Sequence, residues 1–142
     1  MGLEATVYLN KDKVSIEWMD DSAQVDERTG EVYSDTRHIP AKAKEACAYR
    51  LGNGKYIERC RIEVEKAAKG RSLAMPVLLE NLLSGEAHPG DLIAYVQIPA
   101  LKRELRFLSE VPKHSTELQD LVFRLHKLVD AAEQNRNPIV FT

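Results

Sequence analysis

The residues with the clearest potential for chemistry lie in one short turn, residues 88–91. Glu86 and Asp91 flank His88, and a histidine with a nearby carboxylate can act as a general base. Pro, Gly and Asp also favour tight turns for conformational reasons alone, and this simpler interpretation is preferred. His88 and Asp91 therefore remain the alternative site, at which a small enzyme or a ligand-binding domain would be centred.

The other reactive residues show no spacing typical of a catalytic or metal site. His38, His114 and His126 have no Cys or His partner at ligand spacing, so no metal site is predicted. Cys47 and Cys60 fall in apolar patterns and are expected to be buried free thiols. The sequence has no phosphate-binding glycine loop and no nucleophile motif, so it predicts no cofactor and favours a non-enzymatic role.

Length and composition are those of an ordinary globular chain. The 142 residues, 44% of them hydrophobic, predict a single domain, residues 1–142, with a core of its own. We see no signal peptide and no apolar run of about 18 residues, so we expect a cytoplasmic protein without a membrane partner. A basic stretch extends from Arg50 to Arg71, but a pI of about 6.1 argues against nucleic-acid binding.

Charge is unevenly distributed along the chain. Residues 17–37 contain seven acidic and two basic residues, whereas residues 41–72 contain nine basic and four acidic ones. The two segments are either solvated faces that attract each other across the fold, or separate surfaces of which the acidic one docks on a basic partner. The candidate partner-binding residues are Asp20, Asp21, Asp26, Glu27, Glu31 and Asp35.

The longest helical signal covers residues 115–134. Apolar residues recur there at steps of three and four, which places them on one face of a helix. Ser115 is a candidate N-cap, and Pro138 follows the helix as a break. Residues 139–141 then predict a short apolar strand that pairs with the N-terminal strands.

The first third of the chain predicts two β-hairpins. Residues 5–9 and residues 13–18 are expected to pair, with Ile16 on the buried face of the second strand. Residues 25–33 predict a smaller, charged hairpin that either lies at a sheet edge or projects outward, with Gly30 at a position that requires positive φ.

Helices are predicted for most of the remaining chain. Before the final helix they cover residues 41–51, 54–69, 76–83 and 99–108. Residues 92–96 fit either a strand or a loop. The expected architecture is α+β, with a small antiparallel sheet, made of the N-terminal hairpin and the C-terminal strand, covered by about five helices.

Three segments of the chain resemble, in the same order, a family of small bacterial proteins. They are residues 1–8, residues 49–53, and residues 76–79 with Ser84-Gly85 and His88-Pro89-Gly90-Asp91. That family is itself similar to the single-domain immunity proteins of polymorphic-toxin systems. Its members carry cysteines after the first strand and just before the Gly-Asp pair, where this chain has Leu9-Asn10 and Pro89.

The resemblance implies a bacterial protein-binding domain, and the family offers no established catalytic residues to carry over. Together with the acidic segment, it leads us to expect a non-enzymatic protein that blocks a basic toxin domain through its acidic surface. The sequence does not name the partner and leaves a homo-oligomer open.

Overall fold

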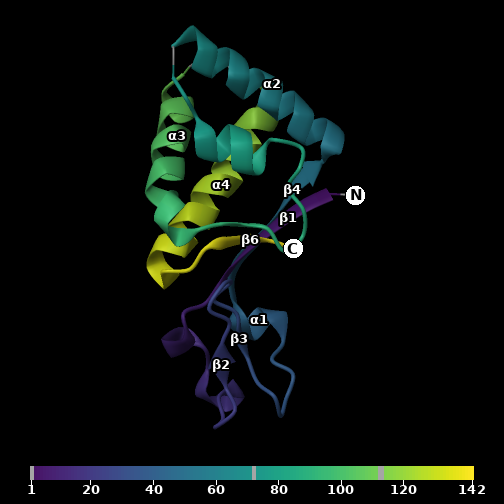
Figure 1. Ribbon diagram of the computed structural model, residues 1–142, viewed down its shortest axis with the longest axis vertical. Helices are drawn as coiled ribbons and strands as arrows, with labels where there is room; N and C mark the ends of the chain where they lie inside the picture. Colours follow the sequence, from purple (N-terminus) through teal and green to yellow (C-terminus); the bar gives the residue numbers. More distant parts are fainter. Residues whose placement is uncertain (1, 72, 112–113) are drawn as a thin grey trace.

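The main body of the protein is built on a four-stranded antiparallel sheet (Figure 1). The computed structural model describes residues 2–71, 73–111 and 114–142. In the order in which they lie in the sheet, the strands are β4 (Glu45–Asn53), β1 (Gly2–Tyr8), β6 (Ile139–Phe141) and β5 (Leu92–Ile93). The expected α+β class is confirmed, and so is the pairing of the C-terminal strand with the N-terminal one, since Ala5 lies opposite Phe141.

The N-terminal hairpin was predicted with the wrong partner. Strand β1 pairs with β4 on one side and β6 on the other, and residues 13–18 form no strand. Two 3-10 turns occupy that region, η1 (Lys11–Lys13) and η2 (Ile16–Trp18). The alternation that predicted a strand is misleading, because Val14 is buried while Ile16 is 88% exposed.

The helix predicted for residues 41–51 was also wrong. Only one helical turn forms, α1 (Ala41–Lys44), and the chain then continues as β4. Cys47, Tyr49 and Leu51 alternate toward the core, whereas the side chains between them are exposed. Pairing along the whole length of β1 outweighs the helix propensity of the alanines in this segment.

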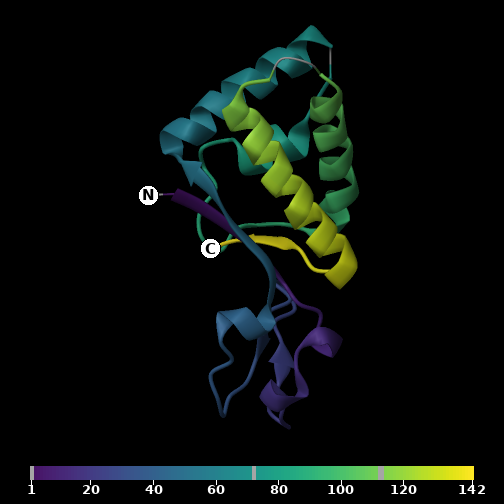
Figure 2. The same cartoon turned by 180° about the vertical axis from the view of Figure 1, so that it is seen from behind.

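Helices pack against the inner face of the sheet and enclose the main core. They are α2 (Gly54–Gly70), the π-helical segment η3 (Val77–Leu82), α3 (Ile98–Glu110) and α4 (Thr116–Asn135). These four confirm the helices predicted for the second half of the chain. Figure 2 shows α4 running from the α2 end of the main body down toward the other end of the molecule. The undecided segment, residues 92–96, contains β5 and the start of a 3-10 turn, η4 (Tyr95–Gln97).

Two of the expected helices begin with a side-chain cap, and the cap at Ser115 was predicted. Ser115 Oγ accepts a hydrogen bond from the backbone N–H of Leu118 at 3.1 Å, which fixes the start of α4. Asn53 caps α2 in the same way through the N–H of Tyr56. In the described part of the chain, no helix is long and apolar enough to cross a membrane.

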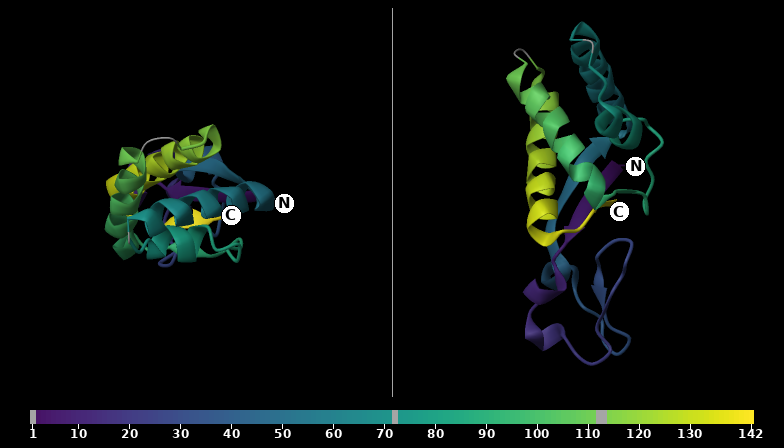
Figure 3. Two further views of the ribbon diagram at one scale, coloured as in Figure 1. Left: turned by 90° about the horizontal axis from the view of Figure 1, so that it is seen from above. Right: turned by 60° about the vertical axis from the view of Figure 1, so that its left-hand side comes forward.

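Residues 9–44, which we call the insert, leave the sheet between β1 and β4 and form a separate lobe. Figure 3 shows the helices gathered around one end of the molecule and the insert extending from the other. The insert contains the two-stranded hairpin of β2 (Gln24–Val25) and β3 (Val32–Tyr33), which confirms the second predicted hairpin. Its own small core consists of the buried residues Val14, Val32 and Ile39.

Hydrogen bonds fasten the insert to the end of α4. The N–H of Asn10 donates to Oδ1 of the buried Asn135 at 3.0 Å, and Lys13 Nζ donates to the carbonyl of Gln134 at 2.9 Å. Gly30 has φ of +81°, as predicted, and a Cβ there would collide with the side chain of Asn137. The insert therefore has a defined orientation on the main body.

Candidate functional site

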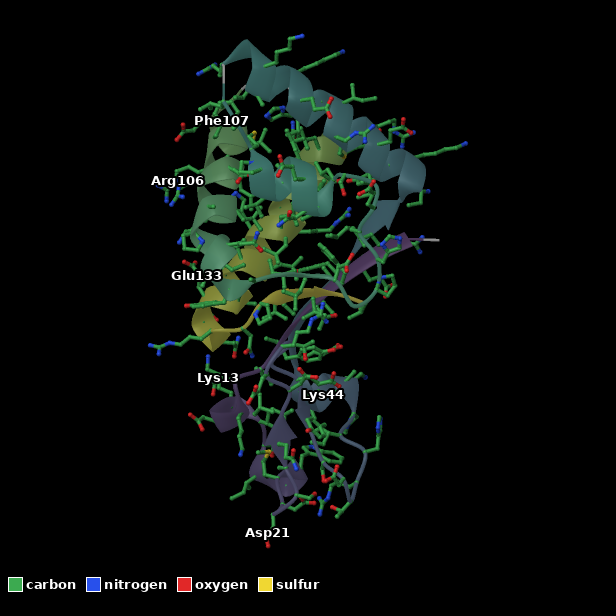
Figure 4. All side chains as sticks on the ribbon, viewed as in Figure 1. Lys13, Asp21, Lys44, Arg106, Phe107 and Glu133 are labelled. Carbon is green, nitrogen blue, oxygen red and sulfur yellow. The ribbon has the colours of Figure 1, made fainter. Side chains whose placement is uncertain are left out.

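The six acidic residues predicted to bind a partner all lie on the insert, but they form two groups. In the first group, Asp20, Asp26 and Glu31 form hydrogen bonds or an ion pair within the protein. In the second, Asp21, Glu27 and Asp35 are exposed and, in the described structure, bond to no other side chain. Figure 4 shows Asp21 at the far tip of the insert, pointing away from the rest of the molecule.

Asp20 ties two loops of the insert together. Its carboxylate accepts hydrogen bonds from the hydroxyls of Ser22 and Thr36, both at 2.6 Å, and from Ser34 at 3.2 Å. The hydrogen bonds from Ser22, and then those from Thr36 and Ser34, hold the pKa of Asp20 well below its usual range. The role of this residue is to hold the loops around residues 20–22 and 34–36 in place.

Replacing Asp20 with alanine is expected to loosen the tip of the insert and leave the main body folded. The depressed pKa means that the contribution of Asp20 is present above the ordinary carboxyl range and is lost only as the pH falls through the lower folded value. Hydrogen exchange should therefore speed up in residues 20–36 but not in α4. Asp21→Ala is the control, and equal exchange in both variants would contradict the assignment.

Asp26 and Glu31 are also used internally. Asp26 Oδ1 accepts the backbone N–H groups of Arg28, at 2.8 Å, and Thr29, at 3.1 Å, which closes the hairpin turn. Glu31 forms an ion pair with Lys44 at the base of the insert. Asp26 stays exposed while it closes the turn, whereas Asp20 and Glu31 are only partly exposed, so three of the six predicted carboxylates also serve the fold of the insert.

The insert also presents apolar groups to solvent, and sequence reasoning missed the most exposed of them. Ile16 is 88% exposed, and Val25 and Tyr33 are each 39% exposed. The 3-10 turn at residues 16–18 places Ile16 outside the small core instead of within a sheet. The insert therefore exposes both acidic and apolar side chains, the two kinds of group that protein interfaces use at their rim and at their centre.

The acidic and basic segments do not face each other across the fold. Helix α2, which carries most of the basic segment, lies at the end of the main body opposite the insert (Figure 1). Among the described residues, the ion pair between Lys44 and Glu31 is the one that joins the two segments. The insert carries eight acidic and six basic residues, and α2 carries five basic and three acidic ones, so the two regions differ only modestly in net charge.

The alternative site at His88 and Asp91 is an exposed turn. Asp91 Oδ2 accepts the backbone N–H of His88 at 3.0 Å, and the ring Nδ1 lies 3.7 Å from the same oxygen. The His88 and Asp91 side chains are 76% and 55% exposed. Since the carboxylate caps the turn and the ring is solvated, the geometry does not form a positioned general base.

The remaining reactive groups serve the fold. His114 Nε2 contacts the carbonyl of Leu108 at 2.7 Å. The Ser109 hydroxyl, 3.2 Å from His126 Nε2, donates to a carbonyl in its own helix, so it is not set up as a nucleophile. Burial raises the pKa of the Cys60 thiol to about 11, as expected for a buried free cysteine. Within the described ranges, no cluster of three or more potential ligands could hold a metal ion.

Comparison with known proteins identified no relative of this chain. No protein-family model matches the chain, and neither the curated proteins nor the solved structures give a match. The resemblance to immunity proteins therefore stays a prediction, and function has to be argued from the surface of the molecule.

Proposed function

We propose that the protein is a non-enzymatic binding domain whose insert docks on a basic surface of a partner protein. One observation carries this proposal: the insert projects from the main body and exposes Asp21, Glu27 and Asp35, while the other predicted acidic residues are used to hold its shape. A surface that is already ordered loses less conformational entropy on binding than a mobile loop does.

The exposed side chains have complementary roles in this proposal. The three free carboxylates attract a basic partner and speed the encounter, which is the main effect of charges at the rim of an interface. Ile16 supplies apolar area that is removed from water on contact. A toxin whose substrate-binding cleft is basic would suit this surface, and docking there would block the cleft as an immunity protein does.

The first experiment is capture of partners from native lysate at low and high salt. The proposal expects a basic protein that is retained at low salt and lost at high salt, because screening weakens the attraction between exposed charges. If that protein is a toxin domain, the chain should also inhibit its activity in a purified assay. Capture alone does not identify the docking surface, so charge reversal on the insert follows.

Reversal of the three free carboxylates should slow association. The variant Asp21→Lys, Glu27→Lys, Asp35→Lys is expected to reduce the association rate constant by about tenfold or more at low salt, with little change in the stability of the fold. The matched control reverses three exposed acidic residues of the main body, Glu110, Asp120 and Asp130, and so changes the net charge equally. Equal association rate constants for the two variants in stopped-flow mixing would contradict the docking proposal.

A further inference from the structure

A hollow of about 520 Å³ lies on the main body beside the N-terminal end of β1. The start of β1, the end of β4, the first turns of α2, the end of η3 and the loop at residues 85–89 form its walls. Figure 1 shows this loop passing from η3 toward the N-terminal end of β1. The hollow is separate from the acidic surface of the insert.

The walls of this hollow are largely apolar. Ile57, Leu82 and Leu83, each less than 10% exposed, line it, and the partly buried Leu3 and Ala87 add to the apolar lining. The volume lies within the range of about 300–1,000 Å³ that small-molecule sites occupy, and such sites combine apolar walls with a few polar groups. The apolar walls select a ligand with a hydrocarbon body.

Arg61 is the cationic side chain of the lining, and it makes few contacts. One terminal nitrogen lies 3.5 Å from the carbonyl of Ser84, and Nε lies 3.6 Å from Glu65 Oε1. Nε is buried and, within the described structure, has no hydrogen-bond partner. A guanidinium has five N–H donors, so most of its capacity is unused here. A carboxylate would provide two acceptors in the geometry that guanidinium matches best.

Two other features of the opening bear on the charge of a ligand. The first turn of α2 begins at this hollow, and the positive end of the helix dipole favours an anion there, but Arg61 is the eighth residue of the helix, so this effect acts at the opening and not at the guanidinium. Glu58 also lines the opening, but it is exposed, so water screens its repulsion of a carboxylate. Glu65 Oε1 lies 3.6 Å from Arg61 Nε and is exposed as well, so a ligand carboxylate would compete only with a solvent-screened partner for the guanidinium.

We propose that this hollow binds a small monocarboxylic acid with an apolar body. Its carboxylate would pair with the Arg61 guanidinium, and its hydrocarbon chain would lie over Ile57, Leu82 and Leu83. This proposal does not rest on the docking function of the insert, because no residue of the insert lines the hollow.

Titration with sodium octanoate and with 1-octanol, followed in amide NMR spectra, tests the proposal. Octanoate should shift the amides of α2 and of residues 85–89 and bind at least about tenfold more tightly than octanol, since a charge-assisted pair adds to the shared apolar contact. Arg61→Gln should remove this preference and retain octanol binding. Lys66→Gln, an exposed change on the same helix, should retain the preference.

A second variant tests the hollow independently, in case Arg61→Gln disturbs the fold. Ala87 is half-buried at the opening, and Ala87→Phe should fill the hollow and abolish binding of both compounds while the circular dichroism spectrum is unchanged. No shifts with octanoate at millimolar concentration would overturn the proposal. Shifts that are the same in the wild type and in the folded Ala87→Phe variant would also overturn it.

Discussion

Replacing Glu104 with alanine is expected to lower the free energy of unfolding by about 3 kcal/mol. Glu104 is 8% exposed on α3, and its carboxylate accepts the N–H groups of Leu78, at 2.8 Å, and Val77, at 3.3 Å. These are the first N–H groups of η3, which have no acceptor within the segment itself. Removal of the carboxylate would leave two buried donors without partners.

Urea denaturation of Glu104 variants measures this effect. Glu104→Gln keeps one carbonyl acceptor and should lose less stability than the alanine variant. Glu110→Ala, an exposed change near the end of the same helix, should alter stability by no more than about 0.5 kcal/mol. If Glu104→Ala were as stable as Glu110→Ala, the cap would be irrelevant to the fold.

The same carboxyl group makes stability depend on pH. Burial raises the pKa of Glu104, and the Glu80 carboxylate adds to this, while the two backbone donors and Arg103 oppose it. The folded state thus binds the proton more tightly than the unfolded chain does. The stability that Glu104 gains from this tighter proton binding is fully present below the pKa of the unfolded chain. It is lost as the pH rises through the pKa that Glu104 has in the folded state. The stability advantage of wild type over Glu104→Gln should therefore grow as the pH falls from 7 to about 4.

Replacing Gly52 with alanine is expected to cost about 3 kcal/mol, although the position is at the surface end of a strand. Gly52 has φ of +142°, and a Cβ there would lie 2.3 Å from Cδ1 of Tyr56. The tyrosine ring cannot move freely, because its hydroxyl donates to the carbonyl of Glu117 and so links α2 to α4. Backbone strain and the displaced ring act together.

Gly54 is the matched control for this prediction. It lies two residues further on, at the start of α2, and a Cβ there would meet no atom within 4 Å. Gly54→Ala should leave stability unchanged or raise it by roughly 0.5 kcal/mol, since alanine reduces the freedom of the unfolded chain. Thermal denaturation of both variants makes the comparison. Similar melting temperatures would show that Tyr56 accommodates the added methyl group.

The insert illustrates how one kind of residue takes different roles within a short segment. Asp20 and Asp21 are neighbours with the same charge, yet the first is bound by three hydroxyl groups and the second points into solvent. A surface formed in this way presents its free charges in a fixed arrangement. Binding studies that alter both residues together would mix an effect on the fold with an effect on docking.

Local sequence patterns determined the elements whose contacts are close in the chain. Helix α4 followed from its three-and-four apolar spacing and the Ser115 cap, and both depend on residues within one or two turns. Gly30 likewise marked a turn that needs positive φ. The apolar residues after Pro138 predicted the last strand because a short apolar run must be buried.

Tertiary structure decided the features that depend on partners far along the chain. Residues 45–51 are a strand because β1, more than 35 residues earlier, offers a full ladder of hydrogen bonds, which no local pattern reports. The structural role of Asp20 required the hydroxyls of a second loop, and the weakly paired Arg61 became visible only once β1, β4 and α2 enclosed an apolar hollow. Sequence alone specified which segments could be ordered and which charges were present. The long-range packing decided which charges are used within the fold and which are left free to bind.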